Sequence, residues 1–175
     1  MISVEDENKQ IATQFIELLN SRKFEELSNF IHKEFRFFPE GIEYYDYYRE
    51  IAPDVPDFEI TKDGWLNRLK YEQTSFTDLK RIILKIMAED DEVWVWTKRR
   101  GKHTTDFDGF PASNREIDIY SFVRYQIKDG QIYRSFNLDD DLRGFIQIGK
   151  LILEENDEAK VGQYMSQLRR IGLIK

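Results

Sequence analysis

The chain lacks cysteine and has only two histidines, His32 and His103. Without cysteine it can form no disulfide, no thiolate nucleophile and no zinc–thiolate site. Two histidines are too few for a histidine-rich metal centre, and the sequence contains no glycine-rich phosphate loop or nucleophile elbow. We therefore expect neither a metal nor a cofactor.

Long apolar runs are also missing. No stretch approaches the ~20 apolar residues that span a bilayer, and no N-terminal signal pattern is present. We expect a cytoplasmic protein that does not bind membranes. The net charge of −7 disfavours nucleic acid as a partner, because an acidic protein repels phosphate. The basic run Lys98, Arg99, Arg100 and Lys102 is interpreted as a solvated strand edge.

Aromatic residues are abundant. They make up 14% of a chain of 175 residues, which favours one domain with a large core or cavity. Helical spacing of apolar residues predicts a helix over 5–20, a short second helix and a third helix over 61–71. From about residue 78 the period changes to alternation, which predicts strands. Helices followed by a run of antiparallel strands indicate an α+β fold with the helices on one face of the sheet.

The last two predicted strands cover 115–127 and 131–138. They meet at Asp129-Gly130, which is typical of a type I′ hairpin turn. Residues 39–60 contain prolines and several tyrosines, and we interpret them as an insertion that forms a loop or lid, or else an ordinary packed surface segment. A helix over 142–154 and a C-terminal helical extension over 155–175 complete a single domain, 1–175.

Five segments, taken in order, resemble one known family. They are "NKQIATQFIELLNSRKFEELSNFI", "DGWLNRLKYEQTSFTDLK", "AEDDEVWVW", "GKHTTDFDGFPASNREI" and "YQIKDGQIYRSFNLDDDLRGFIQIG". Together they are similar to the SnoaL-like polyketide cyclases of the NTF2-like superfamily. The resemblance covers most of residues 7 to 150. Phe136 stands where that family commonly has tryptophan.

The resemblance implies a cone-shaped, strongly curved antiparallel sheet closed by N-terminal helices, and it implies a homodimer. It also implies cofactor-free aldol cyclisation or isomerisation of a small apolar carbonyl or polyketide-like compound. In that family one aspartate after the last strand transfers the proton. The spacing from Gln147-Ile148-Gly149 assigns this role to Asp140. His103 matches the family's histidine and would polarise or orient the substrate.

Strand parity agrees with Asp140. Uninterrupted alternation would put it on the same sheet face as Ile132, Arg134, Phe136 and Leu138. In a dry pocket such a carboxylate could take and return a proton near neutral pH. The aspartates at 139–141 could instead cap the helix that follows.

Arg134 would share the pocket with Asp140, where it would tune charge or bind an anionic group. An arginine with two acids is also the constellation of limonene-type epoxide hydrolases, which share this superfold, and Asp118 could be the second acid. An ordinary cross-strand salt bridge would explain the same residues. A further alternative is a non-catalytic module for ligand binding or dimerisation.

Six aromatic residues are predicted to bind substrate if they face the concave side of the sheet. They are Trp65, Trp94, Trp96, Tyr120, Phe122 and Phe136. The same side chains could instead form an ordinary core.

Overall fold

The computed structural model describes residues 2–38 and 60–151. The predicted lid at 39–60, except Ile60, and the predicted extension at 155–175 lie outside the described residues. The helices are α1 (Val4–Asn20), α2 (Phe24–Ser28), α4 (Lys62–Ser75) and α5 (Asp141–Ile148). The strands are β1 (Ile31–Phe38), β2 (Ile60–Thr61), β3 (Phe76–Glu89), β4 (Glu92–His103), β5 (Glu116–Lys128) and β6 (Gln131–Asp139).

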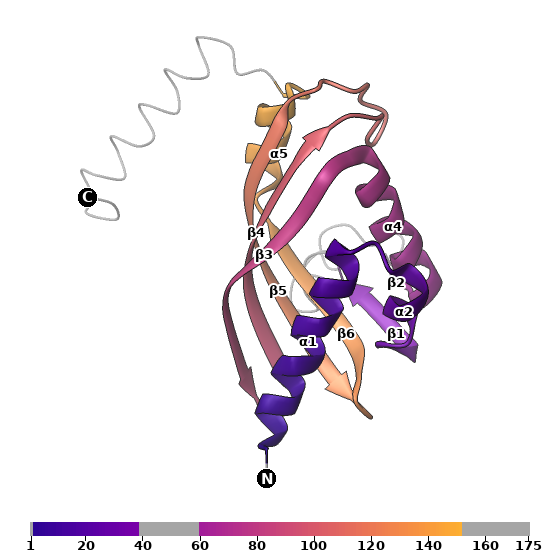
Figure 1. Cartoon of the computed structure of the whole chain (residues 1–175), viewed down its shortest axis with the longest axis vertical. Coiled ribbons are helices and arrows are strands. Elements are labelled where there is room, and N and C mark those ends of the chain that lie inside the picture. The colour runs from indigo at the N-terminus through magenta and orange to yellow at the C-terminus, as the bar shows by residue number, and fades with distance from the viewer. Residues whose placement is uncertain (1, 39–59, 152–175) are drawn as a thin grey trace, which may run out of the picture.

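The strands form one strongly curved sheet in the order β2-β1-β6-β5-β4-β3 (Figure 1). Neighbouring strands are antiparallel except β1 and β6, which are parallel. Helices α1 and α4 pack on the inner face, and α5 follows the end of β6 (Figure 1). The predicted α+β fold, with a bent sheet covered by N-terminal helices, is confirmed.

Local sequence signals explain where several elements begin and end. Helix α1 begins after Ser3, whose hydroxyl accepts the N–H of Asp6 at 3.2 Å, and three acids in its first turn suit the helix dipole. The turn between β5 and β6 has positive φ at both Asp129 and Gly130, 52° and 71°, as a type I′ turn requires.

The main core lies between α1, α4 and the inner face of the sheet. Trp65 of α4 is at its centre: its ring stacks on Phe15 at 5.2 Å and on Phe35 at 4.5 Å, and only 4% of the residue is exposed. The sequence predicted that Trp65 binds substrate. In the structure it packs in the core instead.

Bulges in β3 and β6 change which residues face inward. In β6, Ile132 pairs with Ile127 and Arg134 pairs with Gln126, so Tyr133 is an extra residue between them. A bulge in β3 lies between Ile83 and Lys85. Each bulge moves the following residues to the opposite face of the sheet, because side chains alternate with period two. The prediction of uninterrupted alternation from Ile132 onward is therefore wrong.

The outer face of the sheet carries the other predicted substrate-binding aromatics. On β4, Val93, Val95 and Thr97 are buried, so Trp94 and Trp96 point outward, and 45% of Trp96 is exposed. Tyr120, Phe122 and Phe136 also lie on this outer face, opposite the buried residues of β5 and β6. These five do not meet the condition for substrate binding, a place on the concave side, because alternation gives the inner positions to smaller side chains.

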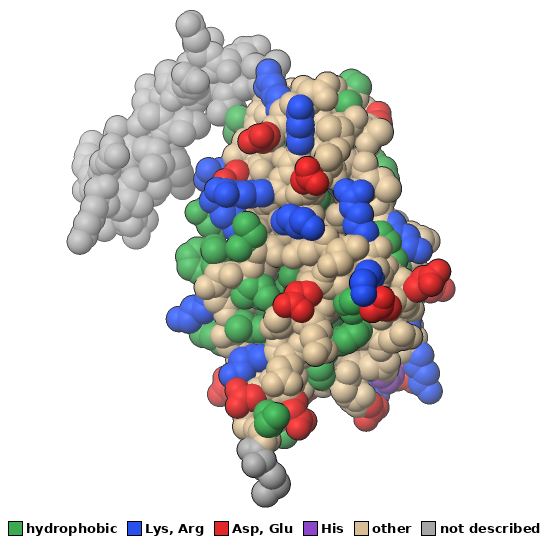
Figure 2. Space-filling view, in the orientation of Figure 1, with side chains coloured by type: hydrophobic (Ala, Val, Ile, Leu, Met, Phe, Trp, Pro, Cys, Tyr) green, Lys and Arg blue, Asp and Glu red, His purple; other side chains and the backbone are tan. Residues whose placement is uncertain are grey.

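Charged side chains of both signs are interspersed on the face seen in Figure 2, and hydrophobic side chains gather on its strand side. None of the helices in the described part of the chain is long and apolar enough to cross a membrane.

Trp65→Ala is expected to destabilise the fold by about 3–5 kcal/mol, because it removes a large ring from a packed stack and leaves a cavity. Chemical denaturation of both proteins measures this difference. Trp65→Phe keeps one aromatic ring in the stack and should cost less. A cost below about 1 kcal/mol for the alanine variant would show that Trp65 is not a core residue.

Candidate functional site

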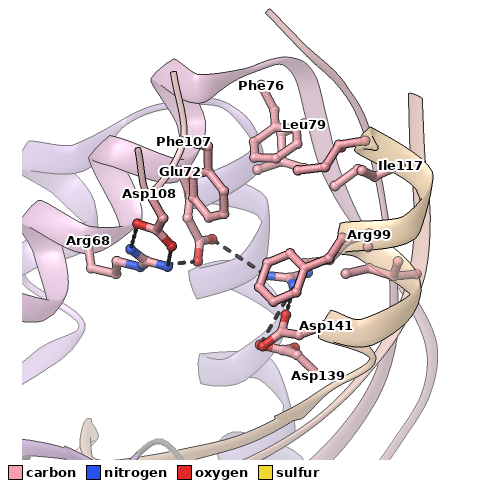
Figure 3. Close-up of a pocket in the computed structure, with 14 residues that line it drawn as sticks. Arg68, Glu72, Phe76, Leu79, Arg99, Phe107, Asp108, Ile117, Asp139 and Asp141 are labelled. Carbon is pink, nitrogen blue, oxygen red and sulfur yellow. Dashed lines mark hydrogen bonds and ion pairs between the residues drawn. The ribbon is translucent and has the colours of Figure 1, made fainter. Parts of the chain in front are cut away.

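A pocket of about 140 Å³ opens at the α5 end of the sheet. Its size is comparable with cavities that admit one small aromatic ring. It lies between the C-terminal half of α4, the ends of β3 to β6, helix α5 and the connection over 104–115 (Figure 3). Its apolar lining consists of Phe76, Leu79, Phe107, Ile117, Ile119, Phe145 and Ile148, and its charged lining of Arg68, Glu72, Arg99, Asp108, Asp139 and Asp141.

Arg99 is the charged residue at the centre of this pocket (Figure 3). Only 8% of the residue is exposed, and its guanidinium lies 3.7 Å from Glu72, 3.7 Å from Asp139 and 3.6 Å from Asp141. Burial opposes the charge, but the three carboxylates outweigh it and raise the pKa of Arg99 above its usual value. Its Nε has no hydrogen-bond partner among the described residues.

The two aspartates beside Arg99 differ in their readiness to hold a proton. Burial opposes the ionisation of Asp139, but the Arg99 guanidinium outweighs burial and lowers the pKa of Asp139. Asp141 is at the pocket rim with 62% of its side chain exposed. Partial desolvation and the neighbouring Asp139 carboxylate raise the pKa of Asp141, against the opposing effect of Arg99. Asp141 therefore binds a proton more readily than Asp139 does.

A second ion pair, between Arg68 and Asp108, lies at the mouth of the pocket. The guanidinium of Arg68 donates two hydrogen bonds to the Asp108 carboxylate, at 2.9 Å and 3.1 Å. These bonds lower the pKa of Asp108 and raise the pKa of Arg68. The Asp108 N–H also donates to the Tyr71 hydroxyl at 2.6 Å. The connection over 104–115 is therefore held against α4.

Asp140 does not face this pocket. It is exposed and caps α5, where its carboxylate accepts the Arg143 N–H at 3.3 Å. The predicted inward orientation of Asp140 is wrong, because the bulge at Tyr133 gives the inner positions to Asn137 and Asp139. Asp140 lies where the alternative prediction placed it, at the N-terminal cap of the helix that follows β6.

His103 is fully buried at the end of β4 and does not line the pocket. Its Nδ1 accepts the Ser113 N–H at 3.2 Å, which assigns the ring proton to Nε2. Burial lowers the pKa of His103, because it disfavours the charged ring. His103 packs against Phe76, whose ring lines the pocket, and its contact with the site is through that ring.

Arg134 and Asp118 are not brought together with Asp140. Arg134 donates to the Tyr133 hydroxyl at 3.0 Å and to the Glu34 carbonyl at 3.3 Å. Asp118 faces outward and pairs with Lys98 and Arg100, each at 2.9 Å. The predicted grouping of these residues around one pocket is therefore wrong.

Sequence reasoning missed the residues that do converge. Arg99 was assigned to a solvated edge, yet it continues the inward series Val93, Val95 and Thr97 on the same strand. Glu72 lies three residues after Leu69 of α4, at a spacing that repeats the buried helix face. Both signals were present in the sequence. The orientation of Asp139 depends on a bulge that the sequence does not mark.

The described residues contain no group of three or more histidines and acids placed to hold a metal ion. The positive charge at the centre of the described pocket is supplied by Arg99.

A family model described as SnoaL-like polyketide cyclase matches residues 9–148. No curated protein matches the chain. Among solved structures, IdmH from Streptomyces antibioticus is 22% identical, with 81% of this chain and 98% of that one covered and a TM-score of 0.66. TsrD from Streptomyces laurentii is 18% identical, with 86% and 100% covered and a TM-score of 0.69. A SnoaL-like polyketide cyclase from Agrobacterium tumefaciens is 14% identical, with 81% and 97% covered and a TM-score of 0.62. At these identities the likeness supports the fold alone.

Arg99→Met is expected to raise the pKa of Asp139 from below its ordinary value, because the ion pair that favours the carboxylate is lost. In the wild type the ionised Asp139 stabilises the fold above its unfolded-state pKa, and this contribution is lost as the pH falls through its lower folded value. Carboxyl ¹³C NMR titration measures both aspartates.

The matched control is Arg100→Met, one residue along the strand on the outer face, which should change the titration of Asp118 instead. Arg99→Lys keeps the charge if the methionine variant folds poorly. An Asp139 titration that is the same in wild type and Arg99→Met would show that the pair is too weak to matter.

Proposed function

Because the chain belongs to the SnoaL-like polyketide cyclase family, we propose that its pocket carries out cofactor-free acid/base chemistry on a small, mostly apolar carbonyl compound. The observation that carries this proposal is a buried guanidinium, Arg99, beside two aspartates of unlike proton affinity in a pocket with an apolar lining. A neutral ketone fits such a lining, and its oxygen is an acceptor for Arg99.

In the proposed reaction the Asp141 carboxylate takes a proton from the carbon next to the carbonyl. The C–H electron pair becomes the C=C bond of an enolate, and the negative charge moves to the oxygen, where Arg99 stabilises it. If the ketone also carries a C=C bond next to that carbon, the enolate is a dienolate, and return of the proton to its far carbon moves the double bond, which is isomerisation. Attack of the enolate carbon on a second carbonyl of the same ligand is aldol cyclisation, and the new alkoxide then takes the proton from Asp141. Asp139 holds Arg99 in place throughout.

A second candidate is epoxide hydrolysis. One Arg99 nitrogen, Nη2, lies 3.7 Å from Asp139 and 3.6 Å from Asp141, which is an arginine between two acids. In that reaction Asp139 would take a proton from water as the water oxygen attacks the epoxide carbon. The C–O bond breaks, and protonated Asp141 gives its proton to the departing oxygen. These convergent polar groups are not what a non-catalytic binding module predicts.

We also propose that the outer face of the sheet binds a second copy of the chain. Large apolar side chains are exposed across β3, β4 and β5, among them Leu84, Trp96 and Phe122. Charges of both signs stand beside them, since Asp118 pairs with Lys98 and Arg100 there. An apolar surface with both signs can be complementary to itself, as a two-fold interface requires.

Asp141→Asn is expected to lower the rate of α-hydrogen exchange of 2-indanone in D₂O by about 100-fold or more, because it removes the base. Proton NMR of the ketone measures this rate above the uncatalysed background. The second candidate is tested in parallel with styrene oxide, by formation of the diol.

Asp140→Asn is the matched control. It lies outside the pocket, and asparagine caps a helix about as well as aspartate, so the rate should stay near that of the wild type. If Asp140→Asn lowers the exchange rate as much as Asp141→Asn does, Asp140 rather than Asp141 is the base. Turnover of styrene oxide without exchange of 2-indanone would favour hydrolysis.

Trp96→Glu combined with Phe122→Glu is expected to convert a dimer to a monomer, because a charge is placed on each side of the apolar face. Light scattering after size-exclusion chromatography measures the mass. A wild-type chain that is monomeric at the concentration used for the activity measurement would contradict the proposed interface.

A further inference from the structure

Glu72 is surrounded by guanidinium groups from three elements. Its carboxylate accepts a hydrogen bond from Arg81 of β3 at 2.7 Å, and it lies 3.7 Å from Arg99 of β4 and 3.8 Å from Arg68 one turn earlier on α4. Only 14% of its side chain is exposed. One acid therefore faces three cations, of which Arg68 and Arg99 line the pocket (Figure 3).

Arg99 is held from two opposite sides. Its Nη1 points to Glu72, while its Nη2 points to Asp139 and Asp141 (Figure 3). All three separations are 3.6–3.7 Å, which is longer than a direct N–H···O hydrogen bond. The guanidinium is thus paired in charge, yet it makes no hydrogen bond to these acids within the described residues.

Coulomb attraction from both sides favours this placement. The attraction of Arg99 to Glu72 opposes its attraction to the two aspartates, and both act over similar distances, with Glu72 and Asp139 largely shielded from solvent. Without the charge of Glu72, the guanidinium would be drawn toward Asp139 and Asp141 and would close into direct hydrogen bonds. Those bonds would occupy the donors that face the pocket.

We propose that Glu72 is a positioning residue that holds Arg99 away from the two aspartates, so that the guanidinium keeps donors open for a ligand oxygen. The inference rests on the proposed acid/base function of the same pocket and adds the residue that maintains its geometry. Glu72 is not proposed to take part in the proton transfer itself. It acts through Arg99, and through Arg99 on the proton affinity of Asp141.

Within residues 2–38 and 60–151, the charged groups that act on Asp141 are Asp139 on β6, Arg99 on β4, and Glu72 and Arg68 on α4. Removing the charge of Glu72 affects Asp141 in two ways of the same sign. One negative neighbour is lost, and Arg99 moves closer. Both changes favour the ionised carboxylate, so the pKa of Asp141 should fall.

A purely structural role predicts something else. Glu72 also ties α4 to β3 through Arg81, and loss of that tie would lower stability without changing Asp141. Two variants separate these roles. Glu72→Gln keeps the shape and removes the charge, whereas Arg81→Met breaks the tie and leaves the Glu72 charge in place to hold Arg99.

The experiment uses the full chain and measures two quantities for wild type, Glu72→Gln, Glu72→Asp and Arg81→Met. The first is the Asp141 titration by carboxyl ¹³C NMR, and the second is the pH dependence of 2-indanone exchange. Glu72→Gln should lower the pKa of Asp141 by about half a pH unit or more and move the rise of the rate with pH down with it. Glu72→Asp keeps the charge, so the pKa of Asp141 and the pH dependence of the rate should lie closer to those of the wild type. Arg81→Met should not lower the pKa of Asp141.

An Asp141 titration that is unchanged in Glu72→Gln, with only a loss of thermal stability, would overturn the inference. The two proposals fail separately. If Glu72→Gln lowers the pKa of Asp141 but the wild type does not exchange 2-indanone, the positioning role of Glu72 is supported and the proposed chemistry is contradicted. If the wild type exchanges 2-indanone and Glu72→Gln changes neither the titration nor the profile, positioning falls.

Discussion

The pocket depends on one buried cation. Arg99 projects from the inner face of β4 into a space lined by apolar side chains, where an unpaired guanidinium would carry a large desolvation cost. Glu72, Asp139 and Asp141 supply the compensating charge from three different elements. The interaction therefore fixes where α4 and the start of α5 lie relative to the sheet. It also leaves the aspartates with opposite pKa shifts, which acid/base chemistry can use.

The curved sheet makes this convergence possible. Alternation gives one face to the core and the pocket, and the other to Trp96 and its neighbours on the outside. The same strands thus provide both the proposed reactive site and the proposed contact with a second copy. The bulge at Tyr133 sets the parity of the end of β6, and it decides that Asp139 faces Arg99 while Asp140 is left to cap α5.

Much of the fold could be predicted from the sequence, because helical spacing, alternation and the Asp129-Gly130 turn are local signals. The site was harder. Arg99 is predictable in principle from the alternating series that begins at Val93, but a run of cations on one strand is also typical of a solvated edge. Asp139 could not be chosen over Asp140, since a bulge leaves no clear mark in the residues around Tyr133. The large aromatics of β4 and β5 were predicted to bind substrate only if they faced the concave side, and strand parity instead puts Val95 and Val123 inside.

The central claim is that Arg99 contacts the ligand oxygen. The most direct measurement is the ¹⁵N NMR spectrum of the arginine Nε–H groups as 2-indanone is added to the full chain. The account predicts that the Arg99 signal shifts and saturates while the signal of Arg100, on the outer face, stays in place. An Arg99 signal that does not move, at a ketone concentration that perturbs other residues, would contradict it.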